Sequence, residues 1–364
     1  MKNFLRIAVV VLAFVASCLP GASRLRASSA AEISVATPPL PAFPGASGYH
    51  LLRKYSLPGD GGWDYLAFDP STRRLFISHS TKVLVVNVDT GKLVGEIDNT
   101  PGVHGIALAS DLNRGFTSNG AAGTITIFDL STLQELGTVK AGLNPDAILY
   151  DGGTKRVFAM NGRSHSATVL DATSGKVIAT IPLPGRPEFA VADHAGHVFV
   201  NLEDKNEQAE IDSQGLVLIS HWSIAPCESP TGLAMDIGHR RLFAGCRNVM
   251  LAVVNADTHA VISTQAIGGG VDAVRFDPAT GYVFSSNGHD GSLTVIKEES
   301  PDNYTVVENV PTQVNARTMA LDPRTHEIFL VTAAFTPPAP ATQQDPHPAR
   351  EIVPDSFVLL VFGR

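Results

Sequence analysis

Charged residues are few in this sequence, and no segment gathers the positive ones. Asp, Glu, Lys and Arg make up 17% of the 364 residues, and the formal net charge is −8. A protein that binds a phosphate backbone needs Lys and Arg on one face, so the composition argues against a nucleic acid as partner. The hydrophobic fraction of 44% is large enough to fill a core and excludes a disordered chain.

The motifs of several enzyme and cofactor classes are absent as well. The sequence has no Cys-x-x-Cys-His, which excludes a covalently attached c-type haem. It has no Gly-x-Ser-x-Gly elbow, no Walker loop and no His-Glu-x-x-His motif. With only two Trp, it also lacks the aromatic docking pattern of quinone-dependent enzymes. Motifs alone therefore assign no certain cofactor.

An apolar run stands near the start of the chain. Residues 7–19 follow the positive charges of Lys2 and Arg6, and small residues suited to cleavage follow at 25–31. This predicts a secretory signal peptide over residues 1–30, too short to span a bilayer in a mature protein. The Pro- and Ala-rich residues 31–48 indicate a linker. We expect a periplasmic or secreted protein, with lipidation at Cys18 as the alternative.

Cysteine is almost missing. Cys18 falls within the expected signal peptide, which leaves Cys227 and Cys246 as an even pair. Outside the cytoplasm two such thiols are expected to oxidise, so we predict a disulfide between them. The alternative is a copper-binding or redox-active thiol pair.

What the sequence has in abundance is repetition. A short apolar run centred on a Phe returns every 40–45 residues, preceded by an acidic turn and followed by two further apolar runs. Four short strands at this period are typical of a β-propeller blade. We predict an all-β, seven-bladed β-propeller over residues 49–364, with each repeated Phe packed between blades. The seven are Phe76, Phe116, Phe158, Phe199, Phe243, Phe284 and Phe329.

The last unit has only three strands of its own. An alternating segment at 49–59 precedes the first complete unit. We expect this segment to pair beside residues 356–362 and close the ring, because closure removes exposed sheet edges.

Three tetrapeptides carry a resemblance to a known family. They are Phe-Thr-Ser-Asn at 116–119, Phe-Ala-Met-Asn at 158–161 and Phe-Ser-Ser-Asn at 284–287. With Phe in place of Tyr, the repeats resemble the YVTN-repeat family of secreted seven-bladed β-propellers over residues 49–364. The resemblance implies the fold and an extracytoplasmic location, but no single chemistry. Lactonase-type propellers are similar in architecture.

A candidate site follows from propeller geometry. The first strand of each blade lines the central channel, and the residue five before the acidic turn marks where that strand begins. These positions are polar but varied, which suggests a functional surface rather than repeated packing. They read Asp64, His104, Asp146, Glu188, Thr231, Asp272 and Arg317.

Four carboxylates facing one channel repel one another unless a cation intervenes. Arg317 and His104 neutralise part of this charge. We therefore expect a ligand-binding mouth that could hold a divalent ion such as calcium or an amine-bearing ligand, the alternative being solvated polar residues. The candidate metal ligands are Asp64, Asp146, Glu188 and Asp272.

Loops on the same face add further candidates. His79, His165 and His289 fall between the second and third strands of their blades. Trp63 could offer a stacking surface or fill the space between blades. The Pro-rich connection at 335–355 is long enough to cover the mouth or dock a partner, the alternative being a disordered segment.

Our leading hypothesis is an exported, monomeric binding propeller that takes a small molecule, a metal ion or a protein partner at this mouth. The alternative is a metal-assisted, lactonase-like hydrolase. There Glu188, Asp146 or Asp272 would act as base or metal ligand, with His104 or Arg317 stabilising an oxyanion.

Overall fold

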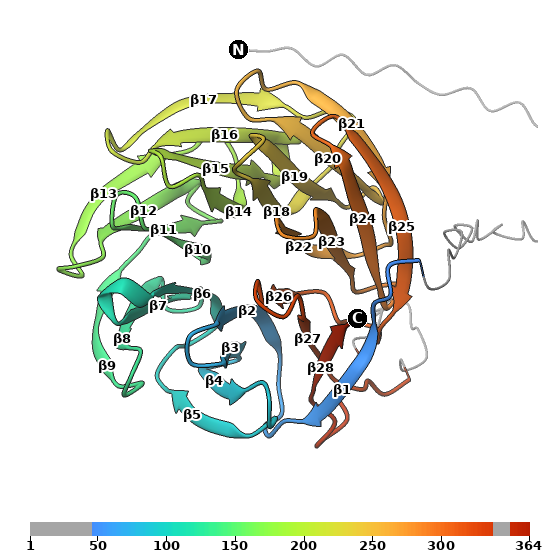
Figure 1. The fold of residues 1–364 in the computed structure, drawn as a ribbon. Helices are drawn as coiled ribbons and strands as arrows, with labels where there is room; N and C mark the ends of the chain where they lie inside the picture. The colour runs from blue at the N-terminus through green and yellow to red at the C-terminus, as the bar shows by residue number, and fades with distance from the viewer. Residues whose placement is uncertain (1–45, 338–349) are drawn as a thin grey trace, which may run out of the picture. The chain divides into compact units, whose positions relative to one another are not determined.

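The structure is a computed structural model that describes residues 46–337 and 350–364. Seven four-stranded antiparallel sheets follow one another around a central channel (Figure 1). The predicted all-β, seven-bladed propeller is confirmed. The expected signal peptide at 1–30, with Cys18, and most of the expected linker lie outside the described residues. Within the described ranges, no helix is long and apolar enough to cross a membrane.

Each blade runs from an inner strand at the channel to an outer strand at the rim. The inner strands are β2 (Trp63–Asp69), β6 (Val103–Ala109), β10 (Pro145–Asp151), β14 (Pro187–Ala192), β18 (Pro230–Asp236), β22 (Val271–Asp277) and β26 (Met319–Leu321). The second strands are β3 (Arg74–His79), β7 (Arg114–Asn119), β11 (Arg156–Asn161), β15 (His197–Leu202), β19 (Arg241–Cys246), β23 (Tyr282–Asn287) and β27 (Ile328–Thr332). The third strands are β4 (Lys82–Asn87), β8 (Thr124–Asp129), β12 (Ser166–Asp171), β16 (Glu207–Asp212), β20 (Met250–Asn255), β24 (Ser292–Ser300) and β28 (Val358–Gly363).

The outer strands complete the blades, and the last of them comes first in the chain. They are β5 (Leu93–Ile97), β9 (Glu135–Lys140), β13 (Val177–Pro182), β17 (Val217–Ser223), β21 (Val261–Ala266), β25 (Asn303–Pro311) and, for blade seven, β1 (His50–Ser56). Two short 3-10 turns, η1 (Ser110–Leu112) and η2 (Glu203–Lys205), follow β6 and β15.

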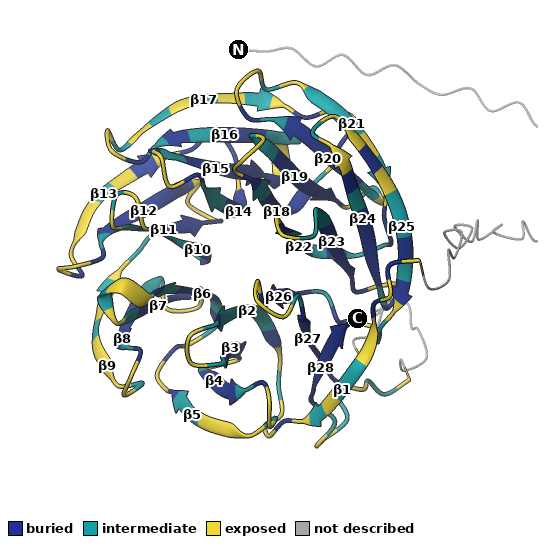
Figure 2. Cartoon of the chain, in the orientation of Figure 1, coloured by how far each residue is buried: buried dark blue, intermediate teal, exposed yellow. Residues whose placement is uncertain are grey.

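The core lies between the blades. The second and third strands are mostly buried, whereas the outer strands alternate between exposed and partly buried residues (Figure 2). All seven repeated Phe side chains are at most 1% exposed, as predicted. Their burial explains the repeat, because each blade has apolar faces that only its neighbours can cover.

The ring closes through β1. It pairs antiparallel with β28, from His50 opposite Gly363 to Ser56 opposite Val358. The predicted closure by an N-terminal strand is therefore confirmed. The backbone N–H of Leu57 donates to the Phe357 carbonyl at 2.8 Å and continues the pairing past the strand.

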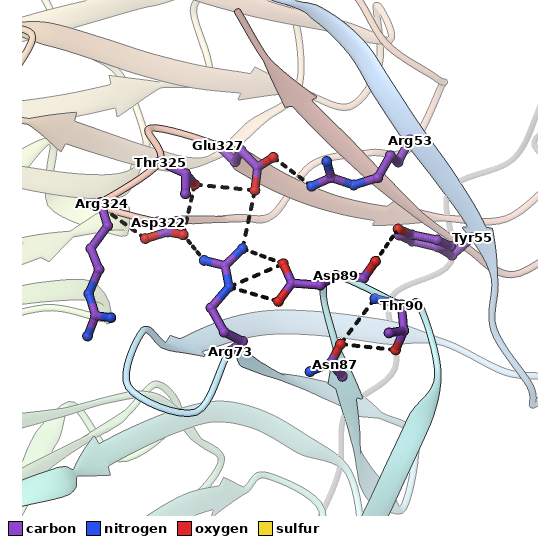
Figure 3. Close-up of polar contacts among 10 residues, drawn as sticks. All are labelled: Arg53, Tyr55, Arg73, Asn87, Asp89, Thr90, Asp322, Arg324, Thr325 and Glu327. Atoms are coloured by element: carbon purple, nitrogen blue, oxygen red, sulfur yellow. Dashed lines mark hydrogen bonds and ion pairs between the residues drawn. The ribbon is translucent and has the colours of Figure 1, made fainter.

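An ionic network reinforces this closure (Figure 3). Arg73, in the turn between β2 and β3, donates to Asp89 of its own blade at 2.7 Å and pairs with Asp322 of blade seven. Arg53 of β1 donates to Glu327 of blade seven at 2.6 Å, and Arg73 lies 3.5 Å from the same carboxylate. The first blade, the last blade and the closing strand are thus joined by one set of charges.

The repeated acidic turns serve the fold. Asp193, for example, accepts hydrogen bonds from the backbone N–H groups of Ala195 and His197, and Arg240 of the next blade pairs with it at 2.7 Å. Burial raises its pKa, but these hydrogen bonds outweigh burial and hold the pKa at about 2. The face that carries these turns, opposite the starts of the inner strands, is called the turn face below.

The predicted disulfide is present. Cys227 and Cys246 are bonded, with their Cα atoms 5.5 Å apart, and both are buried. The bond ties the segment that enters β18 to the end of β19. An oxidised pair is compatible with a location outside the cytoplasm.

Candidate functional site

The starts of the inner strands converge at one end of the channel, here called the mouth face. The pairing of Trp63 with His79 and of Val271 with Asn287 places the starts of inner strands beside the ends of second strands. The loops between second and third strands therefore open on the mouth face, as expected. The turn face lies at the other end of the same strands.

A bulge aims the polar residues into the channel. The register of the inner strands shifts between Trp63 and Leu66, between Val103 and Ile106, and at the matching place in four more blades. A bulge inserts an unpaired residue and redirects its side chain. In these six blades the polar position falls within the bulge. Arg317 of blade seven stands just before β26, whose pairing with β27 has no shift of register. We call Asp64, His104, Asp146, Glu188, Asp272 and Arg317 the mouth ring.

Five members of the mouth ring form a connected chain. Arg317 Nε donates to Asp272 at 2.8 Å, and its Nη2 lies 3.5 Å from Asp64 Oδ1. His104 Nδ1 hydrogen-bonds Asp64 Oδ2 at 2.6 Å and lies 3.8 Å from Asp146 Oδ1. The hydrogen bond to Asp64 raises the pKa of His104, with Asp146 adding to the rise against the opposing effect of burial.

The sixth member, Glu188, joins a group that sequence reasoning did not assemble. Arg186 Nη2 lies 3.6 Å from Glu188 Oε2, while Arg186 Nη1 is 3.0 Å from Glu203 of η2. Arg247 also pairs with Glu203, at 3.0 Å. The sequence did hold a clue to this group. Arg186 stands just before β14, and the other blades have no positively charged residue at the corresponding position. Thr231, by contrast, is buried and donates to the carbonyls of Gly245 and Val271.

The mouth ring has more negative charge than its own cations offset. Burial raises the pKa of Asp146 to about 6 although His104 lowers it, and burial raises that of Asp272 to about 6 although Arg317 lowers it. Burial, and next the charge of Asp146, raises the pKa of Glu188 well above its usual range. Glu188 is 7% exposed, and its Oε2 accepts no hydrogen bond from any described residue. The surroundings of these carboxylates therefore favour the binding of an additional positive charge.

Among residues 46–337 and 350–364, two groups of side chains have the geometry of a metal site. Asp64, His104 and Asp146 each offer a ligand atom, and these atoms lie within 4.8 Å of one another. The second group, on the turn face, is Asp236, His239 and Glu298. The sequence analysis did not predict this second group. The clue in the sequence was an Asp in the turn, Asp236, followed three residues later by His239. Oxygen and nitrogen donors together suit manganese or zinc, whereas calcium would bind through the carboxylate oxygens alone.

The remaining predicted residues are not brought into the mouth ring. Trp63 is 5% exposed and packs against Phe357 and Phe335 of blade seven, between blades. His79 is 2% exposed, lies 4.9 Å from the Phe357 ring, and its pKa is lowered by burial.

Two further predicted histidines lie on exposed loops. The side chains of His165 and His289 form no hydrogen bond or ion pair with the residues that the structure describes. Of the Pro-rich connection, Phe335 pairs with Ile352 as an isolated bridge, and residues 338–349 lie outside the described part. Its predicted role as a cover or docking arm stays a prediction.

Beneath the mouth ring, aromatic side chains narrow the channel. Tyr65 of blade one and Phe189 of blade four have ring centroids 5.3 Å apart across it, and the guanidinium of Arg275 lies 5.1 Å from the Phe189 centroid. The residue after the polar position is small in four other blades. The aromatic residues at 65 and 189 could therefore have indicated this narrowing from the sequence. At Gly105 a Cβ would come within 2.8 Å of the Asp146 carbonyl oxygen, which explains the small residue there.

Comparison with known proteins supports the fold. No protein-family model matches the sequence, and no curated protein matches it either. A chain from a structure of Kuenenia stuttgartiensis hydrazine synthase matches with a TM-score of 0.66 and 14% identity, covering 75% of this chain and 93% of that one. A chain from a crystal structure of the mitotic checkpoint complex matches with a TM-score of 0.70 and 15% identity, covering 94% and 99%. At such identities the likeness shows the β-propeller fold alone.

Proposed function

We propose that this protein is an exported binding propeller whose mouth ring takes a divalent metal ion. The observation that carries the proposal concerns the buried carboxylates of Asp146 and Glu188. They have too few hydrogen-bond donors around them, whereas the neighbouring Asp64 and His104 hydrogen-bond each other. A cation placed among these groups would relieve their mutual repulsion and replace the hydration that burial removes.

The setting supports this reading in two further ways. The disulfide fits an oxidising compartment, and the N-terminal sequence has the pattern of a secretory signal. The tetrapeptides that resemble the YVTN repeat favour membership of that family and an extracytoplasmic location, and we propose that the protein is a monomer. β-Propellers commonly serve as binding scaffolds, so a protein partner at the mouth face remains part of the proposal.

Metal binding is tested by calorimetry on metal-free protein titrated separately with Ca²⁺, Mn²⁺ and Zn²⁺. We expect saturable binding of at least one ion by the wild type, weakened about 100-fold in Asp146→Asn because a charged ligand is lost. His239→Gln is the matched control, since it disables the second candidate group on the turn face and should leave this binding intact. Equal affinity in Asp146→Asn and wild type, or no binding of any ion, would reject the proposal.

A second candidate function is hydrolysis of a lactone at the same place. The observation that favours it is the Asp146 carboxyl, whose pKa of about 6 lies close to neutral pH, where a general base works best. The metal-loaded samples can be offered a panel of simple lactones. Turnover that disappears in Asp146→Asn and persists in His239→Gln would favour a hydrolase, and no turnover would leave binding as the function.

A further inference from the structure

The channel contains a cavity beside and below Tyr65 and Phe189. This cavity of about 420 Å³ extends from Tyr65 and Phe189 to Pro278 and Pro323 on the turn face. Its volume falls in the range of small-molecule sites, about 300–1,000 Å³. No member of the mouth ring lines it, so it is distinct from the proposed metal site.

Most of the side chains that line this cavity are apolar. Its lining includes Phe68, Phe276, Leu149 and Tyr150, with several Ala and Leu residues between them. Among the described residues that line it, Arg275 alone has a formal charge at neutral pH. Burial lowers the pKa of Arg275 to about 10, so the guanidinium is still protonated at neutral pH.

Arg275 is partly buried and has few partners of its own. Its Nη1 donates to the Val274 carbonyl at 2.8 Å, and no carboxylate within the described ranges forms an ion pair with it. Tyr65 is within electrostatic reach of the guanidinium, and its hydroxyl has no hydrogen-bond partner among the described residues. A guanidinium has five N–H donors, so Arg275 has donors that no described residue uses and that an acceptor entering the cavity could take. The Arg275 guanidinium therefore has no negatively charged hydrogen-bond acceptor among the described residues.

We propose that this cavity binds a small organic carboxylate, with its anionic end held by Arg275 and Tyr65 and its apolar body against the aromatic walls. A planar guanidinium matches a carboxylate through two parallel hydrogen bonds. A single cation in an apolar cavity suits a monoanion better than a phosphate, which carries more charge and needs more donors. Such a ligand would enter from the turn face, away from the negative mouth ring.

The wild-type protein alone provides the first test. Calorimetric titration with benzoate, phenylacetate and hexanoate should give saturable binding of at least one of them, with benzamide at least about 10-fold weaker than benzoate because it has no charge to pair with Arg275. If none of the three carboxylates binds, or if benzamide binds as tightly as the best of them, the proposal is wrong.

Variants locate the binding. Arg275→Gln should weaken the best carboxylate about 10- to 100-fold, and Tyr65→Phe, which removes only a hydroxyl, should weaken it less than about 10-fold. Arg324→Gln is the matched control, because it removes an exposed positive charge from the turn beside Pro323 on the same face. Melting curves confirm that each variant is folded. Equal affinity in Arg275→Gln and Arg324→Gln would overturn the assignment.

The test is independent of the proposed metal site. Asp146→Asn, which should lose metal binding, should keep the carboxylate affinity of the wild type. Loss of carboxylate binding in Asp146→Asn to the level of Arg275→Gln would place the ligand in the mouth ring and contradict the inference.

Discussion

Deletion of residues 49–57 is expected to lower the melting temperature of the protein by at least about 10 °C. The deletion removes all of β1 together with the buried side chains of Tyr49 and Leu57. It also turns β28, whose six residues are all buried, into an exposed sheet edge. Burial of two large side chains and the pairing of β1 together contribute about 5 kcal/mol or more.

Differential scanning calorimetry measures this effect, and Lys54→Ala serves as control because Lys54 is an exposed residue of the same strand. A synthetic peptide with the sequence of residues 46–58 should restore much of the lost stability when added to the truncated protein, since the gap beside β28 remains. A truncated protein that melts like the wild type would show that β1 does not hold the ring closed.

The double variant Asp146→Asn, Glu188→Gln is expected to be more stable than the wild type at pH 8 in metal-free buffer. Burial raises the pKa of both carboxyls above their values in an unfolded chain. A rise from 3.8 to about 6 at Asp146 corresponds to about 3 kcal/mol lost from the free energy of unfolding once the group is ionised. Neutral amides of similar shape avoid this cost.

The sign follows from proton linkage. Between pH 4 and the raised pKa, the folded protein holds protons that the unfolded chain has released, so the free energy of unfolding falls as the pH rises. As the pH falls to 4, near the pKa values of the unfolded chain, both states keep most of these protons, and the difference between variant and wild type should shrink towards zero. Groups such as Asp193, whose pKa of about 2 is depressed, act in the opposite direction, and comparison of the two proteins cancels their effect.

Urea denaturation at pH 4, 6 and 8 gives the difference in the free energy of unfolding between the double variant and the wild type at each pH. Glu299→Gln, which removes an exposed carboxylate, is the control. A variant that is no more stable than the wild type at pH 8 would show that these carboxyls are not destabilising. Addition of the ion that binds should stabilise the wild type and leave the double variant unchanged.

The fold could be predicted because the sequence pattern that specifies it recurs along the chain. Seven recurrences of one Phe-centred strand require seven equivalent environments, and a blade with three strands of its own requires a fourth from elsewhere. The mouth ring was predictable for the same reason, since the inner strands of a propeller all begin at one end of the channel. Even the pairing of oppositely charged neighbours, such as Asp272 and Arg317, follows from that placement.

The repeat does not predict which residues contact one another across the channel. Arg275 lies three residues after Asp272 in an ordinary alternating strand, and only the completed ring brings it over Phe189 of another blade. Trp63 adjoins a mouth-ring residue in sequence, yet its side chain turns to the packing between blades because the bulge after it redirects the strand. Arg186 lies outside the repeated strand pattern and pairs with a residue from a different loop.

The closing strand also determines the order in which the molecule can be completed. Of the strands that the structure describes, β1 is synthesised first and β28 last, so the two partners stand at opposite ends of the propeller sequence. A chain interrupted before residue 358 has no partner for β1, whatever the state of the blades between. Synthesis, and transport if the chain is exported, must therefore deliver the whole domain before its final sheet can form. Until then β1 is an unpaired strand open to a chaperone or to another copy of the chain.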